Sequence, residues 1–283
     1  MIVCVAGAAP AHGRAAVSYH LAMSLGQQGL GTLLVDADPG GPFSEIGDLS
    51  ESGVALDRRG SMVLRSMPAK APSVLCGFGA AVQAEPEKAI SRLRRLRGEY
   101  DVVVIDGPDA MAGGEMGRLL GQGDHLVVVT QFDGASFEAM LPLLEAAGRE
   151  RSRDGKPALH AVLPVKSPGQ QESQEGAATR LMLAREIPAA FPLGTEPYSI
   201  DEAAALRPLP AGVSALRDAC ARLAASLRDS LPIAALPALA APSIDAELTV
   251  IDPAMQAIPA VPRRPEAGPA AIPAKRPAGV FRQ

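Results

Sequence analysis

The chain has 283 residues, of which 47% are hydrophobic, 20% charged and only 3% aromatic, with no Trp. This composition supports a sizeable core and excludes a chain disordered throughout, while so few rings disfavour a stacking platform for single-stranded nucleic acid. A formal net charge of −4 gives no general attraction for nucleic acid or anionic membranes. Three scattered cysteines, Cys4, Cys76 and Cys220, predict neither a disulfide framework nor a zinc site, and they favour a cytoplasmic location.

Residues 1–230 alternate between short β-branched runs and Ala- and Leu-rich segments of helical length. Strands that alternate with helices predict the α/β class, with a mostly parallel sheet and helices on both faces. The strand runs are nearly all apolar, as expected for strands buried on both sides. The predicted strands are Ile2–Ala6, Thr32–Val35, Val102–Ile105, Leu126–Thr130 and Leu159–Leu163, and the predicted helices are Ala15–Gln28, Pro86–Arg97, Gly134–Ala147 and Val213–Leu227.

The composition changes near residue 230, because Leu231–Gln283 holds ten of the 26 prolines. Proline removes backbone donors and breaks helices, so we predict a folded domain over 1–230 and a Pro/Ala-rich extended or disordered tail over 231–283. The same prolines argue against a C-terminal amphipathic membrane helix. Two interpretations of the tail remain open: a solvated segment with no specific role, or a tether that carries a docking motif. We expect no signal peptide and no transmembrane segment.

The first strand leads into a loop and a helix that begin Gly7-Ala8-Ala9-Pro10-Ala11-His12-Gly13-Arg14-Ala15-Ala16. Further on stand His20-Leu21-Ala22, Asp36-Ala37-Asp38-Pro39, and the strand Tyr100–Pro108, which reads YDVVVIDGP. In this order the segments resemble the MinD/ParA family of P-loop ATPases, which read K-G-G-x-G-K-[ST]-T, N-L-A, D-x-D-P and then a Walker B strand. The resemblance covers about residues 1–229 and implies a P-loop NTPase-like fold.

The resemblance also implies a set of site residues, all at the carboxyl ends of predicted strands, where open α/β sheets bind ligands. An alternative interpretation is that the carboxylates of Asp36, Asp38 and Asp106 cap turns and helices, and that His12 is an exposed loop residue. The implied nucleotide-binding residues are Gly7, His12, Gly13, Arg14 and Asp36, and the catalytic residues, if the protein is active, are Asp38 and Asp106.

The phosphate loop departs from the family pattern. In the register set by His20-Leu21-Ala22, the signature lysine falls at Ala9, the second lysine at Arg14 and the Mg²⁺-binding hydroxyl residue at Ala15. Pro10 has no backbone N–H to offer a phosphate, and no lysine occurs in the first 69 residues. Phosphoryl transfer depends on positioning and charge neutralisation, so we expect a pseudo-ATPase. We expect no metal site and no firmly bound cofactor, and weak ATP or ADP binding, with or without Mg²⁺, stays open.

The segment Asp133–Pro142 resembles the cellulose-synthase-associated BcsQ/YhjQ-like branch of the same family. It implies a dimeric scaffold or spatial regulator for bacterial cellulose or another exopolysaccharide, with protein partners in a cell-envelope assembly at the inner membrane. The alternative is an active ATP hydrolase with a divergent P-loop, acting in partition, division-site or secretion-system positioning. The chain has no Asn for base recognition. A DNA-binding function would need a basic face, for which Arg92–Arg97 is the candidate, although such a run is more often a solvated helix face.

Overall fold

A computed structural model gives the structure, which describes residues 1–7, 13–38, 43, 63–65, 71–107, 114–131, 133–200 and 214–231. Most of the loop after the first strand and the predicted tail beyond Leu231 lie outside these residues, so the predictions made for His12, Pro10 and the tail stay predictions. No helix in the described ranges is both long and apolar enough to span a membrane.

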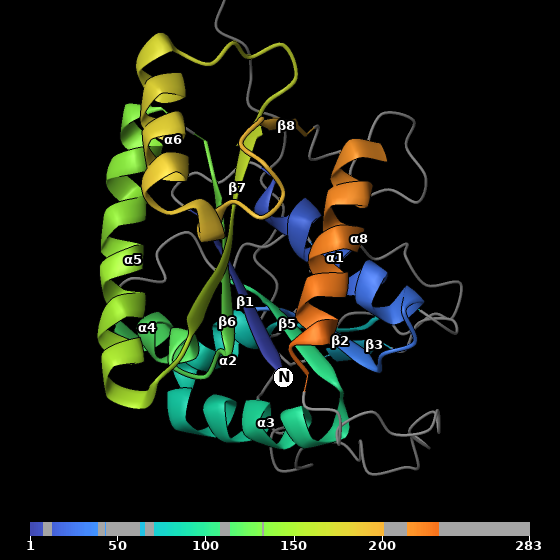
Figure 1. Cartoon of the computed structure of the whole chain (residues 1–283). Helices are drawn as coiled ribbons and strands as arrows, with labels where there is room; N and C mark the ends of the chain where they lie inside the picture. The colour runs from blue at the N-terminus through green and yellow to red at the C-terminus, as the bar shows by residue number, and fades with distance from the viewer. Residues whose placement is uncertain are drawn as a thin grey trace, which may run out of the picture. The chain divides into compact units, whose positions relative to one another are not determined.

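The centre of the fold is an eight-stranded sheet with the strand order β3-β4-β2-β5-β1-β6-β7-β8 (Figure 1). Every neighbouring pair is parallel except β3 with β4, which is antiparallel at one edge. The predicted mostly parallel α/β fold is therefore confirmed. The strands are β1 (Ile2–Gly7), β2 (Thr32–Asp36), β3 (Val63–Arg65), β4 (Ser73–Cys76), β5 (Val102–Asp106), β6 (His125–Thr130), β7 (Ala158–Lys166) and β8 (Tyr198–Ser199).

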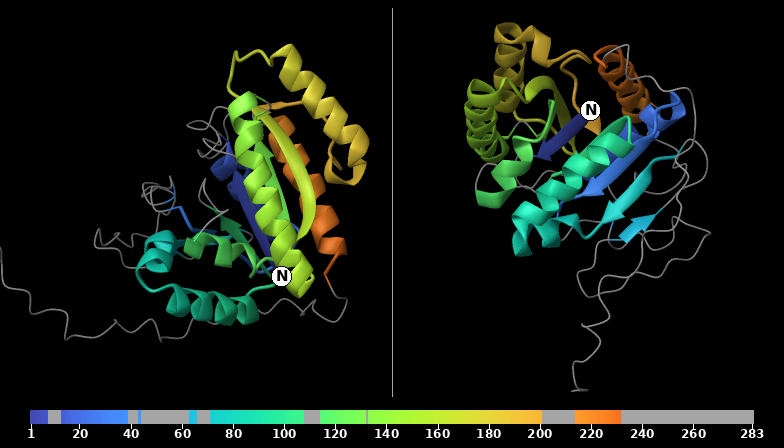
Figure 2. Two further views of the ribbon diagram at one scale, coloured as in Figure 1. Left: turned by 90° about the vertical axis from the view of Figure 1, so that its left-hand side faces the viewer. Right: turned by 90° about the horizontal axis from the view of Figure 1, so that it is seen from below.

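Helices cover both faces of the sheet, as the orthogonal views of Figure 2 show. Helices α1 and α8 pack side by side on one face, and α2, α3, α4 and α5 pack on the other. The helices are α1 (Arg14–Gln27), α2 (Phe78–Ala84), α3 (Pro86–Glu99), α4 (Gly114–Leu120), α5 (Gly134–Asp154), α6 (Gln174–Glu186) and α8 (Ser214–Asp229), with a 3-10 turn, η3 (Pro188–Ala190).

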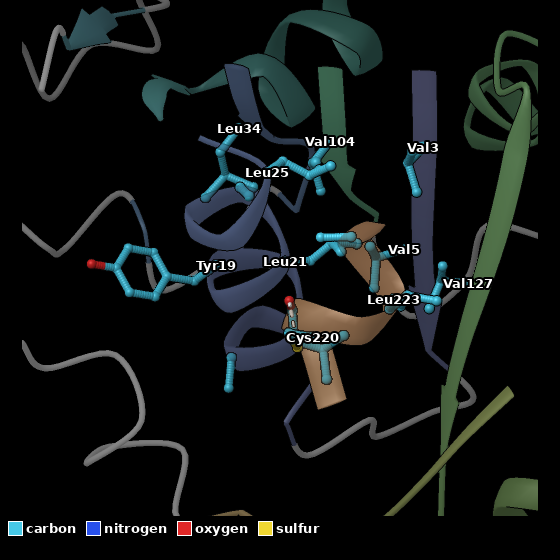
Figure 3. Packing of buried hydrophobic residues seen from close by; sticks show 14 of the residues in the cluster. Val3, Val5, Tyr19, Leu21, Leu25, Leu34, Val104, Val127, Cys220 and Leu223 are labelled. Atoms are coloured by element: carbon cyan, nitrogen blue, oxygen red, sulfur yellow. Dashed lines mark hydrogen bonds between the residues drawn. The ribbon is translucent and has the colours of Figure 1, made fainter. Parts of the chain in front are cut away.

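Two hydrophobic cores follow from the alternation of side chains along each strand. In β1, Val3 and Val5 face α1 and α8, whereas Ile2 and Cys4 face the opposite set of helices. Figure 3 shows the first core, in which Leu21 and Leu25 of α1 and Cys220 and Leu223 of α8 meet the sheet residues Val3, Val5 and Val104. This packing fixes α1 against the sheet, and with it the start of the helix.

The chain continues in the core one residue beyond the predicted domain boundary. Leu231 is 9% exposed and belongs to the core that α1 and α8 share. An apolar side chain held in this way loses burial when it is removed. A truncation that tests the proposed tail should therefore begin after Leu231.

Candidate functional site

Three carboxylates gather where β2 and β5 end, beneath the start of α1. Parallel pairing sets Asp36 beside Asp106 in register, so their side chains project from the same face of the sheet. Asp36 and Asp106 are 1% and 0% exposed. Asp38 follows β2, and its backbone N–H donates to Asp36 Oδ1 at 3.2 Å. The sequence-predicted residues Asp36, Asp38 and Asp106 are thus brought together.

Arg14, the first residue of α1, points inward to these carboxylates and is 4% exposed. Its guanidinium donates to Asp38 Oδ2 at 2.6 Å and to Asp106 Oδ1 at 3.1 Å. One helical turn later, the Ser18 hydroxyl donates to Asp106 Oδ1 at 2.8 Å. Charge-assisted bonds of this length are the stronger class of hydrogen bonds in proteins. A side chain of the protein therefore supplies a cation to the cluster, which we call the Arg14 cluster (Arg14, Asp36, Asp38 and Asp106).

One guanidinium does not satisfy every carboxylate oxygen of the Arg14 cluster. Asp36 Oδ2 and Asp106 Oδ2 are buried and accept no hydrogen bond. Burial, reinforced by the neighbouring Asp106 carboxylate, raises the pKa of Asp36 to about 7. Burial likewise raises the pKa of Asp106 to about 6, although Arg14 and the Ser18 hydroxyl act in the opposite direction. Protons are thus the second source of charge compensation near neutral pH.

An apolar side chain packs against the N-cap residue of α1. Gly13 has φ +90° and is the N-cap residue, with no side-chain capping bond. A Cβ at Gly13 would lie 2.7 Å from Cδ1 of Ile200, which is itself 4% exposed. Helix N-termini attract phosphates when their N–H groups are accessible. The contact with Ile200 concerns the Cα of Gly13, and residues 8–12, which precede it, lie outside the described ranges.

The described residues do not fit a magnesium–nucleotide group of the kind that the fold implies. Mg²⁺ requires oxygen ligands in near-octahedral geometry, and Ala15, at the position of the family's hydroxyl ligand, is apolar and 1% exposed. Arg14 already occupies the carboxylates. Within the described ranges, no group of three or more His, Cys, Asp or Glu side chains is arranged to hold a metal ion. The degenerate phosphate site itself stays a prediction, because residues 8–12 lie outside the described ranges.

A small pocket, which sequence reasoning missed, lies near the ends of β6 and β7. Its polar lining includes Gln131, Lys166 and Gln170. The Nε2 atom of Gln131 is buried and has no hydrogen-bond partner. One wall contains Glu172, which forms a two-bond ion pair with the buried Arg180 at 2.7 and 2.8 Å. The sequence signal was the polar run Gln170–Gln174, separated by three residues from the end of an apolar strand, which marks a loop at the carboxyl edge of the sheet.

Two of the four arginines of α3 are paired with carboxylates. Arg95 pairs with Glu99 at 3.2 Å, Arg97 pairs with Asp124 at 3.0 Å, and Arg94 donates to the Gln122 side chain. Nucleic-acid affinity depends on cations that are free to neutralise phosphates. The solvated helix face is therefore the better interpretation of this run.

The remaining predicted site residue in the described ranges is Gly7, the last residue of β1. It is buried and paired with Val129 of β6. Gly13 adjoins Arg14 at the helix start, but no described contact links Gly7 to the Arg14 cluster. His20, His125 and His160 share no metal-like arrangement, and His125 and His160 stack edge to face at 5.1 Å.

Solved structures that are similar to this fold include a ParA family ATPase, a plasmid partition protein and a cobyrinic acid a,c-diamide synthase. A ParA family ATPase from Chlorobium tepidum TLS aligns at a TM-score of 0.55 and 16% identity, over 81% of this chain and 99% of that chain. A candidate plasmid partition protein from Borrelia burgdorferi B31 bound to AMPPNP aligns at a TM-score of 0.58 and 12% identity, over 81% of this chain and 98% of that chain. Cobyrinic acid a,c-diamide synthase from Mycobacterium smegmatis with bound ADP and magnesium aligns at a TM-score of 0.52 and 20% identity, over 81% of this chain and 94% of that chain.

No family model matches the sequence, and no curated protein matches it. At identities of 12 to 20%, the structural likeness establishes the fold alone. The fold implied by the sequence resemblance is therefore confirmed. Of these three neighbours, the diamide synthase was solved with ADP and magnesium and the partition protein with AMPPNP. What this chain binds has to be argued from its own residues.

Proposed function

We propose that this protein is a ParA/MinD-type domain that does not hydrolyse ATP and acts as a scaffold or spatial regulator of a larger assembly. The observation that carries the proposal is the Arg14 guanidinium, which is bonded to Asp38 and Asp106. Phosphoryl transfer needs a cation and donors placed around the phosphates. Here the first residue of the helix is committed to an internal ion pair.

Two further observations support the same conclusion. Ile200 covers the N-cap residue Gly13, and Ala15 provides no oxygen for a metal ion. In contrast, α1, α8 and the sheet pack together in one hydrophobic core. A fold that is kept while the cation at the start of α1 is bonded to its own carboxylates supports a binding role over catalysis.

The direct test is calorimetry of the full chain with ATP and ADP, with and without Mg²⁺, together with a sensitive phosphate-release assay. We expect no Mg²⁺-dependent increase in affinity and no turnover above the buffer blank. An Asp106→Asn variant serves as the background control for contaminating ATPase. Tight Mg²⁺-dependent binding, or a turnover that Asp106→Asn abolishes while the protein stays folded, would refute the proposal and favour an active enzyme with a divergent P-loop.

A second candidate function, weak nucleotide binding without hydrolysis, is favoured by the pocket near β6 and β7. The unpartnered Gln131 amide and Lys166 offer a buried donor and a cation in one place. Calorimetry separates the two candidates, because this binding would be independent of Mg²⁺. A Gln131→Leu variant should abolish it, whereas Arg14→Lys should leave it unchanged.

For the assembly, we propose bacterial cellulose or another exopolysaccharide system, with a homodimer or heterodimer as the working unit. The support is the resemblance of Asp133–Pro142 to the cellulose-synthase-associated branch. In the structure, Asp133 is the N-cap of α5, and its carboxylate accepts from the Ser136 N–H at 2.8 Å. This capping bond accounts for Asp133 without any partner, so the assembly has to be tested directly.

A pull-down with the full chain and with a chain ending at Leu231 tests the partner and the role of the tail together. We expect envelope-assembly proteins with the full chain and fewer of them with the shortened one. Equal recovery would remove the tail from the proposal. Light scattering of the purified protein gives the oligomeric state, and a monomer at all concentrations would rule out a homodimer.

A further inference from the structure

The Arg14 cluster has an unusual charge balance for a site that is almost fully buried. Among the residues that the structure describes, three carboxylates face one guanidinium, and two of the carboxylate oxygens, Asp36 Oδ2 and Asp106 Oδ2, accept no hydrogen bond. Buried carboxylates are costly unless they are paired with a cation or protonated. The cluster is therefore built around a positive charge, and the chain supplies that charge at Arg14.

We propose that the Arg14 guanidinium is an internal substitute for a divalent cation and excludes one from the Arg14 cluster. This inference rests on the proposed function, because it explains how the fold keeps its carboxylates without a bound metal and nucleotide. The guanidinium contacts carboxylates from two elements, Asp38 after β2 and Asp106 at the end of β5, from its own position at the start of α1. A bridging cation would link the same elements.

The shape of the guanidinium suits this role. Its planar fork donates from two nitrogens at once, Nε to Asp106 and an Nη to Asp38. A lysine ammonium is a point charge that holds a single position. The guanidinium is also more weakly hydrated than an ammonium, which suits a group that is 4% exposed.

The carboxylates of the cluster are not arranged to hold a metal ion while the Arg14 guanidinium is bonded to two of them, and removing the guanidinium charge should convert the cluster into a cation site. In Arg14→Met, a chain of similar length leaves Asp36, Asp38 and Asp106 without their counter-ion. Two of these three residues are fully buried, and their unpartnered oxygens are carboxylate oxygens, the ligand type that Mg²⁺ and Mn²⁺ prefer. We therefore expect a gain of divalent-cation binding that the unchanged protein lacks.

The experiment titrates Mn²⁺ alone into the full chain and follows free Mn²⁺ by electron paramagnetic resonance, with no nucleotide present. We expect no specific binding by the unchanged protein or by Arg14→Lys, which keeps the charge. Arg14→Met should bind Mn²⁺ at least about tenfold more tightly than either, and Mn²⁺ should raise its melting temperature. Adding Asp106→Asn to Arg14→Met should abolish both effects.

Two results would overturn the inference: specific Mn²⁺ binding of equal strength by the unchanged protein and Arg14→Met, or a folded Arg14→Met that gains none. If Arg14→Met does not fold, the double variant Arg14→Met with Asp106→Asn is unfolded in urea instead. Removing one of the uncompensated carboxylates should make the double variant more stable than Arg14→Met alone. A double variant that is no more stable than Arg14→Met refutes the inference. ATP turnover by the unchanged protein would refute the proposed function but is not measured by the Mn²⁺ titration, so the two failures are distinguishable.

Discussion

Replacing Asp36 with Asn should stabilise the protein above neutral pH and flatten the pH dependence of its stability. Asp36 is 1% exposed, and burial with the neighbouring Asp106 carboxylate raises its pKa from 3.8 to about 7. A carboxyl group with a raised pKa in the folded state binds its proton more tightly there than in the unfolded chain. Its contribution to stability is therefore greatest at low pH and is lost as the pH rises toward and past 7.

The magnitude follows from the two pKa values by linkage. With 3.8 for the unfolded chain and about 7 for the folded one, ionisation of Asp36 makes the protein less stable at pH 8 than at pH 5 by about 2 to 3 kcal/mol. Asn keeps the carbonyl oxygen that accepts from the Asp38 N–H. Its amide also supplies hydrogens where Asp36 Oδ2 accepts none. Asn cannot ionise, so this pH dependence should disappear.

The assay is urea unfolding of the unchanged protein and Asp36→Asn at pH 5 and pH 8. The difference between the two proteins isolates Asp36 from other titrating groups, and Asp218→Asn, on the exposed face of α8, is the matched control. We expect Asp36→Asn to gain at pH 8 relative to pH 5 by about the amount above, and the control to show no such gain. A gain that is equal at both pH values, or larger at pH 5, would refute the reasoning.

Three further predictions concern other parts of the fold. Gly13→Ala should lower the free energy of unfolding by about 1 to 3 kcal/mol more than Gly29→Ala does. Both glycines have a positive φ, but only Gly13 lacks room for a Cβ. Equal losses in urea unfolding would contradict this. In the same assay, Arg180→Met should lower the free energy of unfolding by about 3 kcal/mol, because it breaks the ion pair of the buried Arg180 with Glu172. The matched change at an exposed position, Arg185→Met, should lower it by less than about 0.5 kcal/mol. Burial lowers the pKa of His160, so stability should fall below about pH 6.5, and His160→Phe should reduce that fall.

The sequence predicted the elements whose pattern is strong and missed those whose pattern is mixed. The five predicted strands and four predicted helices all occur, because apolar runs such as Val102–Ile105 are buried on both faces. Helix α6 was missed since it buries Arg180 and leaves Leu181 and Met182 more than half exposed. Its burial pattern therefore gives no clear apolar stripe. A tertiary ion pair, which no local pattern encodes, decides which side of α6 faces inward.

The candidate site shows a similar division. The family resemblance implied that Asp36, Asp38 and Asp106 are site residues, and the structure brings them together where β2 and β5 end in register. The direction of Arg14 could not be predicted, because a residue that opens a helix can extend toward solvent or fold back. Its direction depends on the carboxylates that β2 and β5 place beneath it.

The use of arginine over lysine at this position then has a structural reason. A lysine at residue 14 could neutralise one carboxylate at a time, whereas the guanidinium joins Asp38 and Asp106 simultaneously and remains charged at any pH that the fold survives. An ammonium on a flexible stem is better suited to a phosphate that arrives and leaves. The scarcity of lysine in the first strand, loop and helix therefore accords with a site whose cation is permanent. If so, Arg14→Lys should weaken the link between β2 and β5 without opening the cluster to Mn²⁺.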